Sequence, residues 1–458
     1  MSFDPTLAAF RFGTGLSPHH PAPAVITDIM AELVGDDVMA ALHRIPPYAQ
    51  AAPSLLALQE AGRARNAANG TDQQAAAEAY EQTIKDLART RLARNLAADI
   101  ARMVDAPVGF LERLAHFWAD HFTAKARTGS MRHLVSPYIE EAIRPHIAGR
   151  FSDMLQAVTL HPIMLIYLQQ IQSVGPNSAI GLRQAKGLNE NLARELLELH
   201  TLGVGGPYTQ ADVTQMAELL SGLTYHQIDG VVFNARRAEP GSETILGETY
   251  SADPAISTIT DALDDLARHP ATAAHLARKL AVHFVSDTPD EGLVTALSET
   301  FLATDGDLLK VARTLLDHPA AWAKERAKVR SPLEFIAGSL RALGMTGAQI
   351  MALDDQTARG VFDGPLRVMG QPWQRPLGPD GWPEAPDDWI IPQTMAARIS
   401  WAMRRPERLL PTLPDPREFV ITALGPAPDQ AVSFAASAAA STSDGIGVIL
   451  SSSAFQRR

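Results

Sequence analysis

Residues 187–203, with the sequence GLNENLARELLELHTLG, decide how this chain is expected to fold. The leucines recur every three or four residues, which is the spacing of a helix that buries an apolar face. The same stretch carries three glutamates, an arginine, two asparagines and a histidine. Carboxylates on a leucine-rich, buried helix are uncommon and need partners. We therefore expect a helical protein with a polar strip on this helix.

The helical period extends over most of the chain, so the predicted fold class is mainly α, a multi-helical and bundle-like architecture. Residues 53–105 predict two long helices with a joint at 69–72, because this stretch is alanine-rich and lacks breakers after Gly70. Two regions interrupt the pattern. A small β or extended insertion is expected near 223–250, and a long Pro- and Trp-rich loop near 360–392. Further helices are expected at 257–268, 271–286, 290–303, 307–316 and 331–343.

The length of 458 residues is large for one core. We expect an N-terminal helical unit over 1–252, which carries the Asn-Glu-Asn helix, and a C-terminal helical unit over 253–458. The two would pack closely. One continuous domain is the alternative, because no low-complexity linker separates them.

Composition excludes several classes of protein. Hydrophobic residues make up 46% and charged residues 20%, as in ordinary globular proteins. The net charge of −11 argues against a nucleic-acid partner, and the lack of cysteine excludes disulfides and thiolate metal sites. The sequence predicts no transmembrane segment and no signal peptide, so the expected compartment of the chain as given is the cytoplasm.

The Asn-Glu-Asn helix supplies the first candidate site. At 3.6 residues per turn Glu190, Arg194 and Glu198 share one stripe, and Asn191, Glu195 and Glu198 share the next. Glu195 and Glu198 would act as an acid–base pair or as ligands of a hard cation. Arg194 would anchor an anion or orient a carboxylate, and Asn191 would contact substrate. The competing interpretation is an ordinary Glu190–Arg194 ion pair within a structural network.

A second candidate site follows from Glu112, His116 and Asp120, which lie at i, i+4 and i+8 around Phe117-Trp118. A histidine and a carboxylate one turn apart can bind a metal or form an oriented base. His121 falls on another face. If this helix and the Asn-Glu-Asn helix line one cleft, a divalent metal would be held by a set of five residues: Glu195, Glu198, His116, Asp120 and His121. A core histidine with a satisfied hydrogen bond is the competing interpretation.

The proline-rich loop supplies a third group, with Trp373, Asp380 and Trp382 as candidate substrate contacts. Tryptophans mixed with amides and acids suit stacking on a carbohydrate or a peptide. Equally, they could pin an irregular loop against the helices.

Several motifs together resemble the bacterial family called domain of unknown function 1800, over nearly the whole chain. The motifs that carry the resemblance are Phe10-Arg-Phe-Gly, Phe117-Trp-Ala-Asp-His-Phe122, Leu160-His-Pro-Ile-Met164, the run Asn189-Glu-Asn-Leu-Ala-Arg-Glu-Leu-Leu-Glu-Leu-His200, Tyr208-Thr-Gln-Ala-Asp-Val213, Ser331-Pro-Leu-Glu334 and Gly381-Trp382.

The resemblance implies a helical bacterial protein but supplies no reaction. Family members are often exported through a twin-arginine signal and encoded beside a second exported family, which implies a periplasmic location and a companion protein as alternatives. This chain departs from the family pattern in having no such signal. It also has Ala238 where many relatives carry a histidine.

Two functional hypotheses remain at this point. In the first, the chain is a helical hydrolase or metal-dependent enzyme with a carboxylate and histidine cleft, in which Glu195, Glu198, Arg194 and His116 do the chemistry. In the second it is a non-catalytic binding or scaffold protein for a glycan, a cell-envelope component or a companion protein.

Overall fold

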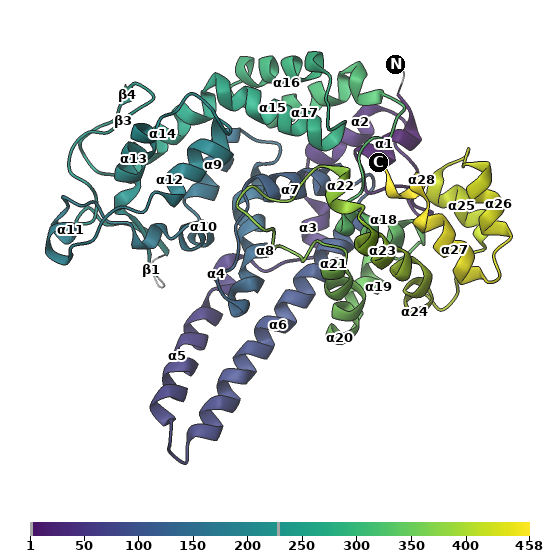
Figure 1. Cartoon of the computed structure of the whole chain (residues 1–458), viewed down its shortest axis with the longest axis horizontal. Coiled ribbons are helices and arrows are strands. Elements are labelled where there is room, and N and C mark those ends of the chain that lie inside the picture. Colours follow the sequence, from purple (N-terminus) through teal and green to yellow (C-terminus); the bar gives the residue numbers. More distant parts are fainter. Residues whose placement is uncertain (1–2, 227–229) are drawn as a thin grey trace.

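The structure is a computed structural model that describes residues 3–226 and 230–458, and it is mainly helical (Figure 1). The predicted fold class is therefore confirmed. Residues 1–2 of the N-terminal stretch and 227–229 of the predicted insertion lie outside the described residues.

The helices of the N-terminal half differ widely in length, and α5 and α6 are the longest of them. In chain order they are α1 (Pro5–Arg11), α2 (Ile26–Met30), α3 (Val38–Leu42), α4 (Tyr48–Ala51), α5 (Pro53–Ala68), α6 (Gln74–Asp105), α7 (Phe110–His121), α8 (Val135–Tyr138), α9 (Phe151–Thr159), α10 (Pro162–Tyr167), α11 (Ala179–Gln184), α12 (Asn191–Glu195) and α13 (Gln210–Leu219).

The described helices of the C-terminal half have at most 15 residues. Its helices are α14 (Ile256–Arg268), α15 (Pro270–Phe284), α16 (Glu291–Ala303), α17 (Leu308–Asp317), α18 (Pro332–Ala342), α19 (Gly347–Met351), α20 (Asp355–Ala358), α21 (Gly364–Val368), α22 (Pro386–Trp389), α23 (Pro392–Arg404), α24 (Pro406–Leu409), α25 (Pro416–Leu424), α26 (Gln430–Ser437), α27 (Thr442–Ser451) and α28 (Ser453–Gln456). The predicted helices between 257 and 343 are confirmed as α14 to α18.

Two helices form an arm that projects from the body of the molecule (Figure 1). α5 and the first half of α6 pack against each other, which confirms the two helices predicted over 53–105. Glu81 of α6 joins the two helices through an ion pair to Arg65 of α5 at 3.0 Å, and it also pairs with Lys85 on its own helix at 2.7 Å. The arm thus has its own side-chain contacts away from the body.

The molecule has two hydrophobic cores, and helix α6 contributes to the second of them. One core is assembled from residues between Leu7 and Trp322. The other joins Leu96–Val104, in the second half of α6, to residues between Leu333 and Phe455. α6 packs on α18 and α19 within the second core. The division into units at 252/253 stays a prediction.

The predicted extended insertion contains two small antiparallel sheets. β1 (Leu223–His226) pairs with β2 (Gly230–Phe233), and β3 (Thr244–Ile245) pairs with β4 (Glu248–Thr249). The predicted long loop is also present. Its first part is helical, as a π-helical turn at Arg359–Asp363 followed by α21, and the irregular run lies between Met369 and Ala385.

The Asn-Glu-Asn helix differs from the regular helix expected from its sequence. Regular α-helix covers α12 only, and Leu196–Thr201 is a π-helix. The amide of Leu202 and the hydroxyl of Thr201 each donate to the carbonyl five residues earlier, at 3.0 and 2.7 Å. A π-turn holds more residues than an α-turn, so the 3.6-residue stripe used to align Glu198 with Arg194 does not continue through it.

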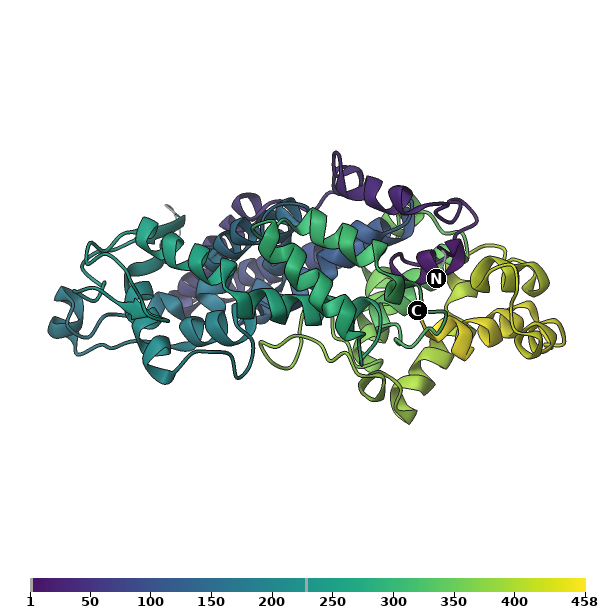
Figure 2. The ribbon, with the colours of Figure 1, turned by 90° about the horizontal axis from the view of Figure 1, so that it is seen from above.

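The molecule is elongated, with residues 151–250 at one end and the C-terminal helices at the other, as the view from above shows (Figure 2). The first helix, α1, and the last helix, α28, lie close to each other in Figure 1. Among the described residues, no helix combines the length and the apolar composition that crossing a bilayer requires.

Candidate functional site

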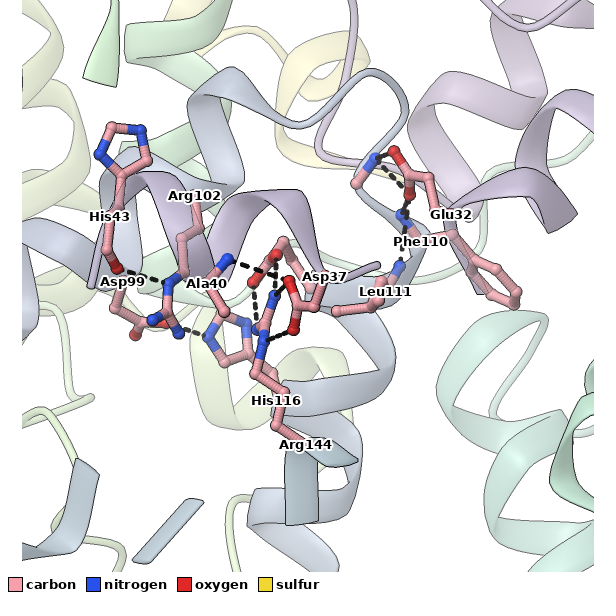
Figure 3. Close-up of polar contacts among 12 residues, drawn as sticks. Glu32, Asp37, Ala40, His43, Asp99, Arg102, Phe110, Leu111, His116 and Arg144 are labelled. Carbon is pink, nitrogen blue, oxygen red and sulfur yellow. Dashed lines mark hydrogen bonds and ion pairs between the residues drawn. The ribbon is translucent and has the colours of Figure 1, made fainter. Parts of the chain in front are cut away.

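Helix α7 is positioned by a carboxylate distant in sequence. Glu32 accepts hydrogen bonds from the amides of Val108, Gly109, Phe110 and Leu111, the first donors of this helix (Figure 3). A helix start leaves such amides unsatisfied, and a negative charge there also complements the helix dipole. The glutamate therefore fixes where α7 begins and which way its polar face points.

That polar face borders a cavity of about 140 Å³. The cavity is enclosed by α6, α7, the segment 135–140, α18 and the irregular loop 369–385. This volume is enough for several water molecules or a small ligand. Much of the lining is apolar, with Trp373, Trp382 and Trp389 among the lining residues. We refer to this cavity as the α7 pocket.

His116 forms a dyad with Asp99 at the α7 pocket (Figure 3). The histidine Nε2 donates to Asp99 Oδ1 at 2.8 Å, and the indole N–H of Trp373 donates to the other carboxylate oxygen at 3.1 Å. Burial lowers the pKa of His116, but the charge and hydrogen bond of Asp99 outweigh it, so its pKa is raised above 6.5. Because Nε2–H is hydrogen-bonded to Asp99, Nδ1 is the ring nitrogen that remains available for proton transfer.

Asp120 lies one helical turn after His116 and also lines the pocket. Its Oδ1 accepts the backbone N–H of Trp382 at 2.7 Å. Gly381 has a positive φ of 87°, and a Cβ there would lie 2.6 Å from the Asp120 carboxyl atoms, so only glycine permits this approach. Burial, opposed in part by Lys279, raises the pKa of Asp120 to about 7.

Glu112, the first member of the predicted stripe, has a structural role. It pairs with Arg144 through two hydrogen bonds of 2.8 and 2.6 Å, and both side chains are buried. Asp37 accepts from the same guanidinium (Figure 3). The three residues of the stripe therefore have different roles. Glu112 fixes Arg144, which lines the pocket, whereas His116 and Asp120 line the pocket themselves.

His121 lies on another face, as predicted, among buried rings. Its Nε2 donates to the carbonyl of His200 at 3.1 Å, and the two rings are 6.3 Å apart. Burial places the pKa of His121 well below 6.5 and lowers that of His200 to about 3. The structure thus separates His121 from His116, with which it was grouped as a metal ligand.

The predicted site on α12 is more open. Arg194 pairs with Glu190 at 3.1 Å, which confirms the expected ion pair, and Asn191 is exposed. Glu195 has a pKa raised to about 7 by partial burial and by the charges of Glu198 and Asp380. The loop therefore brings the exposed Asp380 toward this face, but none of these residues lines the α7 pocket.

The predicted metal set has no geometric support. Within 3–226 and 230–458, no group of three or more histidine, aspartate or glutamate side chains is placed to hold a metal ion. His116 Nε2 and His121 Nε2 are already used by Asp99 and a backbone carbonyl. The side chains that spacing suggested as co-ligands thus belong to separate local networks.

Sequence reasoning missed a second polar stripe, His275, Lys279 and His283 on α15. Their i, i+4, i+8 spacing is the signal that identified the α7 stripe and could have found this one. His283 lines the pocket. Its Nδ1 donates to Glu384 at 2.6 Å and its Nε2 accepts from Arg113 at 3.1 Å, so it is a neutral imidazole, consistent with a pKa of about 4.

Asp99 was missed for a different reason. It lies within the alanine-rich helix α6, where no neighbouring residue marks it, and it meets His116 only through the tertiary fold. Ala238, the position at which the resemblance implied a histidine in relatives, is buried beside Gly222 and lies outside the pocket lining.

Comparison with known proteins gives a family but no activity. The family model described as "Protein of unknown function (DUF1800)" matches residues 9–457. No curated protein and no solved structure matches the chain. Because the family model covers nearly all of the sequence, this chain belongs to the DUF1800 family of proteins of unknown function.

Proposed function

We propose that the α7 pocket is the active site of a hydrolase that works by general acid–base catalysis. The observation that carries the proposal is the pairing of two titratable groups on successive turns of α7. His116 is oriented by Asp99, Asp120 has a pKa near neutrality, and both line one cavity. Groups whose pKa values lie near the working pH are the effective proton donors and acceptors in catalysis.

The two groups take different roles in this proposal. The Asp120 carboxylate removes a proton from an attacking water molecule, whose oxygen bonds to the electrophilic carbon of the substrate. Protonated His116, through Nδ1–H, donates a proton to the leaving oxygen as its bond to that carbon breaks. Both forms coexist around neutral pH, since the pKa of Asp120 is about 7 and that of His116 is raised above 6.5.

A leaving-group comparison tests the roles separately. The substrates would be aryl esters and aryl glycosides, each supplied as a pair of compounds that differ only in the leaving group, which is p-nitrophenol in one and phenol in the other. We expect at least one pair to be cleaved. His116→Gln should slow the phenyl substrate more than the p-nitrophenyl one, because p-nitrophenolate leaves without a proton. Asp120→Asn should slow both by about 10²–10⁴-fold, the usual contribution of a general base.

The control variants are His146→Gln and Asp261→Asn. His146 is half-buried and Asp261 exposed, and neither lines the pocket. Both should retain the wild-type rates. The proposal is wrong if no member of either series is cleaved, or if His116→Gln and Asp120→Asn cleave them as fast as the controls.

A non-catalytic role in binding a companion protein is the second candidate function, and the projecting arm favours it. Tyr80 and Leu87 on α6 are 50% and 52% exposed, on an element that lies clear of the body (Figure 1). If this is the main role, Tyr80→Ser with Leu87→Ser should abolish co-purification of a partner encoded beside this chain, without changing the folding of the body by circular dichroism. Unchanged co-purification would reject it.

A further inference from the structure

The arginines that line the α7 pocket are already paired with carboxylates of the protein. Arg102 donates to both oxygens of Glu140, at 2.6 and 2.9 Å, and to the carbonyl of His43. A bidentate pair of this kind occupies the face of the guanidinium that would otherwise hold a phosphate or carboxylate. Arg102 is therefore not available to an anionic ligand.

The two other arginines in the lining are used in the same way. Arg144 is shared by Glu112 and Asp37, and Arg458 pairs with Glu334 at 3.1 Å and donates to the carbonyl of His283 at 2.9 Å. His283 itself is neutral. Among the described lining residues, protonated His116 is thus the one cation without a second acceptor, and its charge is balanced by Asp99.

The carboxylates that line the pocket are not all paired with cations in this way. Asp120 has no cation within ion-pair distance among the described residues, although the charge of Lys279 favours its carboxylate form, whereas Glu384 pairs with Lys328 and accepts a hydrogen bond from neutral His283. An anion entering the pocket would meet the partial negative charge of Asp120 with no free guanidinium to offset it. Placing a charge in a buried site without a partner is unfavourable.

Four polar atoms of the lining remain open to a ligand. They are Nδ1 of His116, the second carboxyl oxygen of Asp120, the amide nitrogen of Gln371 and the indole N–H of Trp382; for these atoms the described residues provide no hydrogen-bond partner. Gln371 uses its oxygen to accept from the Leu333 amide at 2.8 Å, which fixes the side chain with its NH₂ group free. The set mixes donors and acceptors, as hydroxyl groups require.

The tryptophans supply flat apolar surface beside these polar atoms. Trp373 and Trp389 are each 4% exposed. Their indole N–H groups donate hydrogen bonds to Asp99 and to the Pro383 carbonyl, respectively. Trp382 is only partly buried, and its ring lies 6.0 Å from that of Trp389 at 50°. Trp382 therefore offers a ring that a ligand can cover while hydrogen-bonding at its edge.

We propose that the α7 pocket binds an uncharged, polyhydroxylated ring, a neutral sugar residue, stacked on Trp382 and hydrogen-bonded by Gln371 and Asp120. The inference rests on the proposed function for its site, and it adds the substrate class. Under it, the scissile bond belongs to a neutral glycoside, and an acidic sugar or a sugar phosphate is disfavoured by the paired arginines.

Binding can be measured without turnover. The probes are the methyl glycosides of glucose, galactose, mannose, xylose and N-acetylglucosamine, with methyl glucuronide, methyl galacturonide and glucose 6-phosphate as charged counterparts. Titration would be followed by ligand-observed NMR and calorimetry on the full chain. We expect at least one neutral glycoside to bind saturably and its charged counterpart to bind at least ten-fold more weakly.

Three variants assign binding to the pocket. Trp382→Phe should weaken binding several-fold, and Gln371→Glu, which keeps the acceptor to Leu333 but removes the NH₂ donor, should do the same. Leu377→Ala is the matched control, because Leu377 is on the same loop, is 97% exposed and lies outside the pocket lining. It should bind as wild type does.

The inference is overturned if no neutral glycoside binds, if a charged counterpart binds as tightly, or if Trp382→Phe and Gln371→Glu both bind like the control. Failure of the proposed function looks different. In that case neutral glycosides bind with the expected dependence on Trp382 and Gln371, but no glycoside or ester is cleaved.

Discussion

Helices α7 and α12 carry similar residues but meet different surroundings. Both have carboxylates at helical spacing, and both have a carboxyl group whose pKa is raised to about 7, Asp120 and Glu195. Asp120 faces an enclosed pocket beside an oriented histidine, whereas Glu195 lies on a half-buried face next to Glu198. The comparison teaches that spacing predicts which residues share a face, while the elements packed against that face decide its chemistry.

The largest contrast is expected in turnover. For a substrate cleaved in the leaving-group series, Asp120→Asn should lower kcat by about 10²–10⁴-fold, whereas Glu195→Gln and Glu198→Gln should change it less than about three-fold. Steady-state rates for the three variants, with circular dichroism as the check on folding, decide this. Equal losses in all three variants would remove the distinction between the helices.

Stability should show the next largest difference. Glu112→Gln leaves the buried Arg144 with one carboxylate fewer and should lower the free energy of unfolding by about 3 kcal/mol. Glu190→Gln breaks a partly exposed i, i+4 pair on α12 and should cost about 0.3–0.5 kcal/mol. Urea unfolding measures both. If Glu190→Gln lowered the free energy of unfolding as much as Glu112→Gln does, the Glu190–Arg194 pair would not be the solvent-exposed pair that we describe.

Glycine substitutions should give a smaller but still measurable contrast. Gly381→Ala forces a Cβ against the Asp120 carboxyl at a positive φ and should destabilise by about 1–3 kcal/mol, with a displaced loop. Gly187→Ala, just before α12, places its Cβ in open space and should stay within about 0.5 kcal/mol. Urea unfolding and protease susceptibility of 369–385 check this. An unaffected Gly381→Ala would show that the loop does not press on Asp120.

A further contrast is expected in the pH dependence of stability. The pKa of Asp120 is about 7 in the folded chain and about 4 when unfolded, so the folded state holds the extra proton between these values. Stability contributed by this group is therefore lost as pH rises from about 4 to about 7. Asp120→Asn removes that loss, so its Tm relative to wild type should rise between pH 5 and pH 8.

The exposed Asp261→Asn variant is the control for this measurement and should keep a constant Tm difference from wild type. If the Tm difference of Asp120→Asn is also constant, Asp120 is not the group that titrates near neutrality. The same measurement on Glu195→Gln sharpens the comparison, because its raised pKa predicts the same sign of change.

The helical fold and the arm could be predicted from local patterns, because period, caps and breakers are properties of neighbouring residues. Four of the pocket's lining residues could be predicted too. His116 and Asp120 share a face by spacing, and Trp373 and Trp382 stand out in a proline-rich loop. The π-helical turn at Leu196–Thr201 was not visible, because its hydrogen-bond pattern follows no residue signal in this chain.

What could not be predicted is the set of long-range partners. Asp99 is 17 residues from His116, and Trp382 is 262 residues from Asp120. Neither pairing is implied by the composition or by the helical period of the sequence. Both arise because α6 and the loop 369–385 pack on α7, and local sequence patterns give no information on which distant segments meet.

The most direct test of the account is an NMR titration of His116, by ¹⁵N-labelled imidazole spectra of wild type and Asp99→Asn. We expect an Nε2–H tautomer when the ring is neutral and a His116 pKa above 6.5 in wild type, with a lower pKa in the variant because the carboxylate charge is lost. A His116 pKa at or below 6.5 that Asp99→Asn does not change would contradict the claim that the dyad prepares this residue for catalysis.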